Sequence, residues 1–144
     1  MRHALRLARS GARRGEVPVG ALAVRQGTVI AAASNRVERS GDATAHAEML
    51  VLRRAAHVIG DWRLSGVTLV ATLEPCPMCA GAIIAARVDR CLYGARDTRK
   101  GADGSAYDVL RRPAGDHRVM VAEGVLGPEC GALLSDFFRS LRRR

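Results

Sequence analysis

Two short stretches of the sequence carry residue types that bind metal ions and move protons. The first is His46-Ala47-Glu48, and the second is Pro75-Cys76-Pro77-Met78-Cys79. Cys76 and Cys79 are three residues apart, so both sulfurs can reach one ion from the first turn of a helix. The N-terminus of a helix also lowers the pKa of a thiol and favours the thiolate that metals require.

His46 would supply a third ligand from a second helix, which predicts a Cys₂His zinc site with one Zn²⁺ per chain. Three protein ligands leave a fourth tetrahedral position for water, and this opening separates catalytic zinc from structural zinc. Glu48 lies two residues after His46, so on a helix its side chain points away from the ligand position and toward that water. A carboxylate placed there can take a proton from the water and return it later. The two stretches together predict a hydrolytic site with Glu48 as the proton carrier.

Two other kinds of zinc site share parts of these motifs. A zinc metalloprotease would need a second histidine four residues after His46, but position 50 is Leu50. A purely structural zinc site would need a fourth protein ligand, which Cys91 or Cys130 could supply. That interpretation leaves Glu48 without a task, and both cysteines fit better as small buried hydrophobic residues.

The spacing of apolar and turn residues predicts the elements that position these groups. Helices are expected over residues 2–14, 45–57, 75–87, 106–110 and 128–141, with Thr44 as the N-cap of the second. Strands are expected over residues 17–25, 29–33, 67–73, 90–93 and 119–121, with loops over 34–44 and 95–105. The first two strands form a hairpin that turns at residues 26–28, and the third is apolar enough to be buried on both faces. This alternation predicts a single domain over residues 1–144, a three-layer α/β/α sandwich around a mixed five-stranded sheet.

Length and composition narrow the class of protein further. With 144 residues, 48% of them hydrophobic, the chain can bury a core without disulfide bonds and is not intrinsically disordered. The longest apolar run, residues 67–73, is too short to span a membrane. No apolar signal segment follows Met1, so we expect a cytoplasmic location in which the four cysteines stay reduced.

The chain is strongly basic, with a formal net charge of +9. All its cationic side chains except Lys100 are arginines, and many fall in three clusters: Arg2, Arg6, Arg9 and Arg13; Arg96, Arg99 and Lys100; Arg139, Arg142, Arg143 and Arg144. Such clusters favour a polyanionic partner, most plausibly a nucleic acid. The competing explanation is a solvated helix face in a protein encoded with an arginine-favouring codon bias. The aromatic content of 3% argues against a broad platform that stacks single-stranded bases.

Beyond the metal motifs, the sequence resembles the bacterial tRNA-specific adenosine deaminases (the TadA family), which have a cytidine deaminase-like fold. The resemblance spans most of the chain, and its segments are residues 16–21, 35–36, 42–49, 73–82, 93–97, 101–102, 104–105, 108–110, 117–119, 123–124 and 133–138. The Gly-Ala-Arg-Asp loop at 94–97 and the Asp-Phe-Phe at 136–138 separate this family from the deaminases of free bases and nucleosides. The sequence departs from the family pattern at Val37, Lys100, Asp116 and Leu141.

The resemblance implies hydrolytic deamination of adenosine to inosine at the wobble position of a tRNA anticodon loop, by a homodimer. It implies that Asn35 contacts the flipped base, and that Val19, Leu73 and Phe138 shape the pocket and the path of the flanking nucleotides. Asp97 would lie against the anticodon backbone, with Arg96, Arg99 and Lys100 as phosphate contacts. The backbone N–H groups of Ala47 and Cys76, at helix starts, would face the substrate.

Three competing functions share parts of this pattern. A deaminase of free cytosine, cytidine or guanine would use the same metal chemistry with a different pocket. A deaminase acting on single-stranded DNA would also fit, because the sequence does not visibly read a 2′-hydroxyl. A non-catalytic, zinc-stabilised RNA-binding module would need four protein ligands on the metal and would be indifferent to the loss of Glu48.

Overall fold

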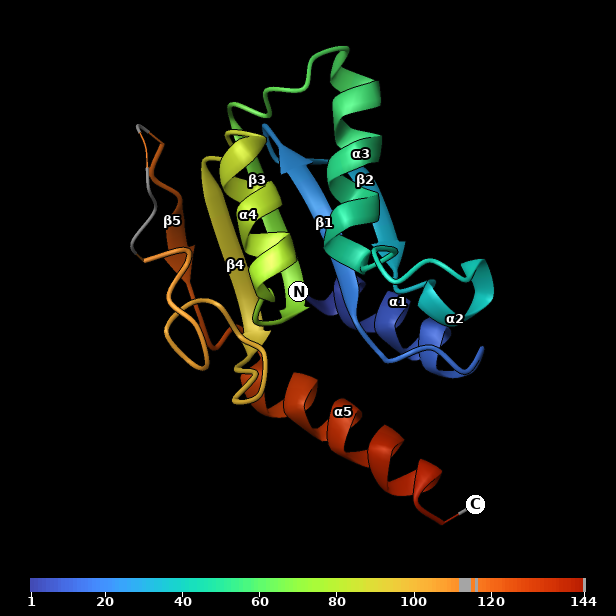
Figure 1. Ribbon diagram of the computed structural model, residues 1–144. Helices are drawn as coiled ribbons and strands as arrows, with labels where there is room; N and C mark the ends of the chain where they lie inside the picture. Colours follow the sequence, from blue (N-terminus) through green and yellow to red (C-terminus); the bar gives the residue numbers. More distant parts are fainter. Residues whose placement is uncertain (112–114, 116, 144) are drawn as a thin grey trace.

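A five-stranded sheet with the order β2-β1-β3-β4-β5 forms the centre of the computed structural model (Figure 1). The strands span Gly20–Arg25 (β1), Thr28–Ser34 (β2), Val67–Leu73 (β3), Arg90–Ala95 (β4) and Met120–Ala122 (β5). β1 is antiparallel to β2 and β3, whereas β3, β4 and β5 run parallel to one another. The structure describes residues 1–111, 115 and 117–143, so Asp116 and Arg144 of the sequence analysis lie outside the described residues.

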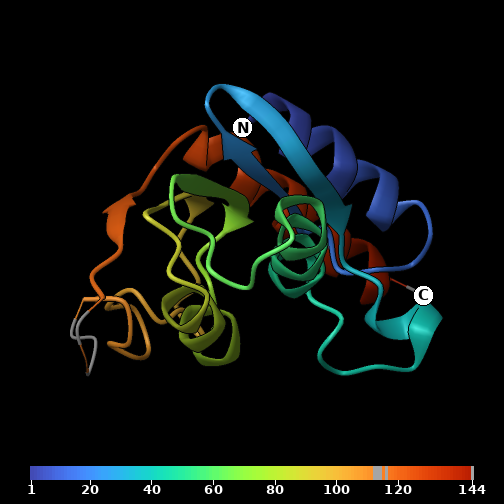
Figure 2. The same cartoon turned by 90° about the horizontal axis from the view of Figure 1, so that it is seen from above.

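Helices cover both faces of this sheet. They span Arg2–Ala12 (α1), Val37–Ser40 (α2), Ala47–Ile59 (α3), Pro77–Ala85 (α4) and Gly127–Leu141 (α5). α1 and α5 lie on one face, and α3 and α4 lie on the other (Figure 2). The predicted three-layer sandwich with a mixed five-stranded sheet is therefore confirmed.

The central strand β3 is buried on both faces, as its apolar sequence predicts. Val67, Leu69 and Ala71 have no exposed surface and belong to the larger core cluster, which also contains buried residues of α3 and α4. Val70, between them, joins a smaller cluster with Leu22 of β1 and the α1 residue Ala4. Side chains on the two faces of β3 thus pack against the two helical layers of the sandwich.

Both helices of the metal motif begin later than the sequence predicts. Thr44 is not the N-cap of α3, because its hydroxyl donates to Asp42 Oδ1 at 2.7 Å and its own N–H donates to the same oxygen. The cap position belongs to His46. α4 begins at Pro77 rather than at residue 75, because a residue that precedes proline is disfavoured in the helical conformation, and Cys76 is extended.

Two other local predictions are wrong for a tertiary reason. Residues 106–110 do not form a helix, because the N–H groups of Val109 and Leu110 both donate to the carbonyl of Ala102. Residues 37–40, expected within a loop, form α2. The N–H groups of Glu38 and Arg39 donate to the side chain of Glu16, which lies more than twenty positions earlier.

Within the described part of the chain, no helix is long and apolar enough to cross a membrane.

Candidate active site

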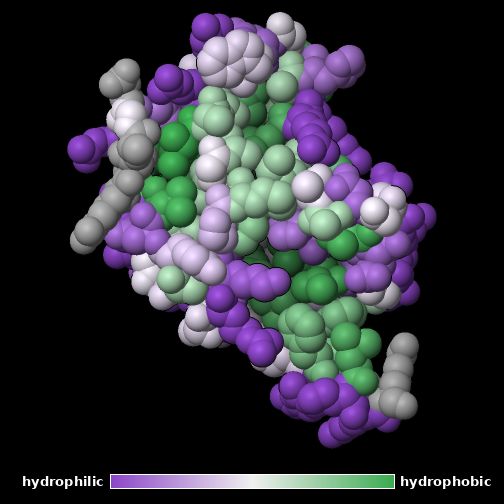
Figure 3. All heavy atoms as spheres, viewed as in Figure 1, coloured by the Kyte–Doolittle hydropathy of each residue, from purple (hydrophilic) through white to green (hydrophobic). Residues whose placement is uncertain are grey.

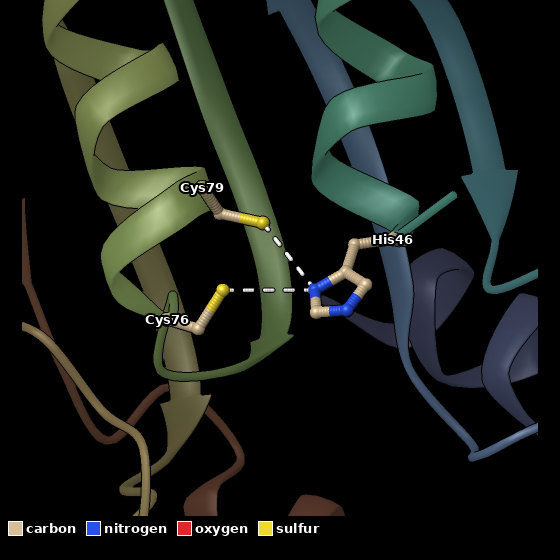
Figure 4. A group of neighbouring side chains, drawn as sticks. All are labelled: His46, Cys76 and Cys79. Carbon is tan, nitrogen blue, oxygen red and sulfur yellow. Dashed lines mark hydrogen bonds between the residues drawn. The ribbon is translucent and has the colours of Figure 1, made fainter. Parts of the chain in front are cut away.

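The N-termini of α3 and α4 bring three metal-ligating side chains together (Figure 4). His46 and Cys76 are the N-cap residues of their helices, and their extended backbones turn both side chains away from the helix axes. The sulfurs of Cys76 and Cys79 each lie 3.6 Å from His46 Nδ1. The three ligand atoms lie within 4.8 Å of one another, close enough to share one ion.

The electrostatics of the two cysteines suit a divalent cation. A hydrogen bond from Cys79 lowers the pKa of Cys76 to about 4, whereas the same contact and burial raise the pKa of Cys79. By itself the pair favours one thiolate and one thiol, because two adjacent anions repel each other. A bound dication would stabilise both thiolates, so the donor set of two sulfurs and one imidazole fits a metal such as zinc.

Glu48 lies on the first turn of α3 beside this cluster. Its side chain is 4% exposed, and its Oε2 has no hydrogen-bond partner among the described residues. Burial raises the pKa of Glu48 to about 7. A buried carboxylate oxygen without a partner is costly, and such groups concentrate at functional sites. A water molecule or a substrate bound next to a metal in this cluster would give this oxygen the hydrogen-bond partner that it lacks.

Asn35 connects the end of β2 to the start of α3. Its Oδ1 accepts a hydrogen bond from the Ala47 N–H at 2.9 Å, and Asn35 itself is buried. The Ala47 N–H, which the sequence analysis directed at the substrate, is thus taken up by Asn35. The bond fixes the amide plane of Asn35 and leaves its NH₂ group as the donor for a ligand.

A cleft of about 1020 Å³ opens over these residues. Figure 3 shows the surface hollowed between the body of the protein and α5, with hydrophobic atoms along the α5 side. The described residues that line the cleft include most of the predicted site: His46, Glu48, Cys76, Asn35, Val19, Leu73, Asp97, Phe138, Arg96, Arg99 and Lys100. Ala47 and Cys79 are fully buried beneath it.

The cleft has a basic rim built from distant parts of the chain. Arg99 and Lys100 come from the loop after β4, whereas Arg139 lies in the last turn of α5 and Arg142 caps its C-terminus. The arginines at positions 2, 6, 9 and 13 lie instead along the exposed side of α1. Only some of the basic residues in the sequence therefore lie at the rim of the cleft.

The other cysteines stay apart from the cluster. Cys91 lies in β4 and Cys130 in α5, and both are buried. Among the described residues, the group with ligand atoms close enough to hold one ion contains only His46, Cys76 and Cys79. Neither Cys91 nor Cys130 supplies the fourth protein ligand that a structural zinc site would require.

Sequence reasoning assigned no role to two buried carboxylates at the edges of the cleft. Glu16 caps α2 through the N–H groups of Glu38 and Arg39, and Glu74 accepts hydrogen bonds from the loop after β4. Glu16 directly precedes the strand expected at 17–25, and Glu74 directly follows the apolar strand at 67–73. An acidic residue that adjoins a core strand is easily buried and then needs several hydrogen-bond donors, which is the signal that could have identified both.

Comparisons with known proteins agree with this fold. The family model described as MafB19-like deaminase matches residues 1–142. The tRNA-specific adenosine deaminase of Bacillus subtilis (strain 168) is 45% identical over 144 residues, which are 100% of this chain and 89% of that protein. The tRNA-specific adenosine deaminase of Agrobacterium fabrum (strain C58) is 44% identical over 142 residues, 99% of this chain and 93% of that protein.

Two solved structures show how closely the fold is shared. One, from work on A-to-I editing by tRNA:A34 deaminases at the wobble position of transfer RNA, has a TM-score of 0.87 and 44% identity. The match covers 91% of this chain and 95% of that one. The guanine deaminase from Nitrosomonas europaea has a TM-score of 0.77 and 28% identity, covering 94% of this chain and 80% of that one.

The sandwich and its His/Cys/Cys cluster at two helix N-termini define a deaminase of the cytidine deaminase-like fold. Within that class, the identities above place the chain more narrowly. It belongs to the tRNA-specific adenosine deaminase family.

Proposed function

We propose that this protein deaminates adenosine to inosine at the wobble position of a tRNA anticodon loop, consuming water and releasing ammonia. The observation that carries the proposal is a carboxylate oxygen of Glu48 that has no hydrogen-bond partner in the described part of the chain and is buried beside His46, Cys76 and Cys79 at the large cleft. Hydrolysis at an amidine carbon needs a group that moves protons next to a site that activates water. The family membership selects adenosine in tRNA among the substrates that such a site could serve.

We assign zinc to the cluster, held by His46, Cys76 and Cys79. When bound there, zinc would lower the pKa of water and supply a nucleophile at neutral pH. His46 and Cys76 both line the cleft, so a metal held by them would be accessible to water and substrate from that side. Glu48, in the first turn of α3, lines the same cleft beside these residues.

The proton transfers fall to Glu48. Its carboxylate takes a proton from the attacking water and delivers it to N1 of the adenine while the new C6–O bond forms. Glu48 then takes the proton of the new C6 hydroxyl and delivers it to the amino group, so the C6–N bond breaks as the C6=O bond forms, ammonia leaves, and N1 keeps the first proton. A pKa near 7 suits this role, because the group can then both accept and donate protons near neutral pH.

The other cleft residues would bind and orient the RNA. Val19, Leu73 and Phe138 would form the apolar walls around the flipped base and its neighbours, and Asp97 would lie against the anticodon backbone. Arg96, Arg99 and Lys100 would contact phosphates from the rim. The bases of an anticodon loop are already unpaired, so flipping one out costs less than it would in a duplex.

Asn35 offers an isosteric test of base recognition. In Asn35→Asp the Oδ1 that accepts the Ala47 N–H is retained, but the NH₂ donor toward the cleft is replaced by an acceptor. We expect kcat/KM for the RNA to fall by about 10²-fold, as when one directed donor is removed from an active site. Steady-state kinetics on a stem-loop RNA, with circular dichroism to check folding, measures the effect. Unchanged kcat/KM would show that this amide does not contact the base.

The proposed reaction is tested by incubating the purified protein with an anticodon stem-loop that has adenosine at the wobble position. We expect inosine at that position by mass spectrometry of the digested RNA, and none when the adenosine is moved one nucleotide along the loop. Free adenosine, cytidine and guanine, and a single-stranded DNA of the same sequence, are assayed in parallel. Deamination of a free base or of DNA without inosine in the RNA would overturn the proposal.

Three further properties remain predictions of the sequence and the family resemblance. We propose that residues 1–144 act as one domain, that two copies form a homodimer, and that the protein works in the cytoplasm on tRNA.

A further inference from the structure

The loop that follows β4 forms one side of the cleft. It carries Arg96, Asp97, Arg99 and Lys100, all of which line the cleft. Arg99 and Lys100 are exposed, and the structure gives their side chains no ion pair among the described residues. The position of these two cations beside the cleft therefore depends on the backbone of the loop that carries them.

The carboxylate of Glu74 is the anchor of this loop. Glu74 is 1% exposed, and its Oε2 accepts the Asp97 N–H at 2.9 Å and the Ser105 hydroxyl. Its Oε1 accepts the Asp103 N–H at 2.9 Å. One buried side chain thus binds the loop at three points spread over nine residues. Charge-assisted hydrogen bonds of this kind are stronger than those between neutral groups.

The anchor is connected to the two cations through Asp97. Asp97 receives its position from Glu74, and its own Oδ1 accepts the N–H groups of Arg99 at 2.9 Å and Lys100 at 3.1 Å. Only glycine fits at position 101, because a Cβ atom there would lie 2.3 Å from the Glu74 carboxylate. The backbone that carries both cations is therefore fixed relative to Glu74.

The same segment also positions the metal ligands. Glu74 follows β3 directly and lies two residues before Cys76, and the neighbouring Pro75 carbonyl accepts the Ala102 N–H at 2.8 Å. One short segment between β3 and α4 therefore holds the basic loop on one side and begins the metal cluster on the other. This segment therefore sets the distance between the basic loop and the candidate metal cluster.

We propose that Glu74 is a positioning residue for the nucleic-acid substrate. Through Asp97, it fixes the cations Arg99 and Lys100 at the distance from the metal cluster at which they meet the phosphates flanking the target nucleotide. This inference rests on the proposed function, since it takes the occupant of the cleft to be a polynucleotide.

Glu74→Gln tests the anchor with an isosteric change. In either orientation, the new NH₂ group faces a backbone N–H, that of Asp97 or that of Asp103, so one donor opposes another. We expect KM for the stem-loop RNA to rise about tenfold, with kcat changed by less than about twofold. We expect one metal per chain to be retained, as in the wild type. Ser105→Ala removes a single donor and should raise KM less.

Salt dependence separates positioning from a loss of stability. Each phosphate contact contributes roughly −0.7 to −0.9 to the slope of log affinity against log salt, so Glu74→Gln should make the salt dependence of KM shallower by about one contact. The exposed Glu129, in the first turn of α5, supplies the matched control, and Glu129→Gln should leave KM and its salt slope unchanged. Equal salt slopes for wild type and Glu74→Gln would overturn the inference.

A double-mutant cycle completes the test. When Arg99 and Lys100 are both replaced by Gln, adding Glu74→Gln should change KM by less than about twofold, because the groups it positions are gone. A second full tenfold effect, or a parallel loss of metal and kcat, would assign Glu74 a purely structural role. The wild-type protein is assayed on the same RNA, so inactivity of the wild type reports against the proposed function rather than against Glu74.

Discussion

Glu48→Gln is expected to abolish turnover while the protein keeps its metal. The glutamine has the same shape but cannot take a proton from water or return one to the leaving group, and general acid–base catalysis typically contributes about 10²–10⁴-fold. Because Glu48 carries out more than one transfer, we expect kcat to fall by at least about 10³-fold. Inosine formation in a stem-loop RNA, measured alongside metal content by plasma mass spectrometry, tests both halves of the prediction.

The same substitution makes a prediction about stability that a merely structural residue would not share. The Oε2 of Glu48 is buried and has no hydrogen-bond partner within residues 1–111, 115 and 117–143, so the native carboxylate destabilises the fold. Replacing it with a neutral amide should leave the midpoint of thermal unfolding of the metal-free protein unchanged or raised. Retained turnover would end the proton-carrier role, and loss of metal together with activity would make Glu48 part of the metal site instead. Glu129→Gln serves as the carboxylate-to-amide control.

Cys76→Ser and Cys79→Ser are each expected to lose both metal and activity. A serine hydroxyl stays protonated near neutral pH, so it cannot replace a thiolate as a zinc ligand. Two remaining ligands hold zinc weakly, and we expect less than about a tenth of a metal ion per chain after dialysis, against about one in the wild type. Metal analysis and the inosine assay on the same samples measure both effects.

The cysteines outside the cluster provide matched controls. Cys91→Ala and Cys130→Ala change thiols that are buried in β4 and α5, away from the His46 imidazole. Both variants should keep one metal per chain and their activity on RNA. If Cys91→Ala or Cys130→Ala instead released the metal, a four-ligand structural site would replace the open catalytic site.

The residues of the candidate metal cluster could be predicted from the sequence because each of its two halves is local, although only the tertiary structure brings the two halves together. Cys76 and Cys79 belong to one helical turn, and Glu48 lies on the first turn of the helix that His46 begins, so spacing alone limits where each side chain can point. Only the exact helix starts were misplaced, since Asp42 takes the hydroxyl of Thr44 and Pro77 keeps Cys76 extended. Neither correction moves a ligand out of the cluster.

The walls of the cleft depend on contacts between distant parts of the chain. α2 forms because the carboxylate of Glu16 caps it from outside, and residues 106–110 avoid a helix because the carbonyl of Ala102 takes their N–H groups. The pattern of apolar and polar residues along a short stretch of sequence does not show hydrogen bonds of this kind. The anchoring role of Glu74 is of the same kind, since its three donors come from residues 97–105.

The sequence by itself determined the layered sandwich and the residues of the candidate metal cluster with the carboxylate beside it, because hydrophobic period and residue spacing act within single helices and strands. Only the tertiary structure decided which cations reach the cleft and which buried acids hold its edges. Those arrangements depend on hydrogen bonds between segments that the sheet brings together, and on the cost of leaving a buried carboxylate without donors.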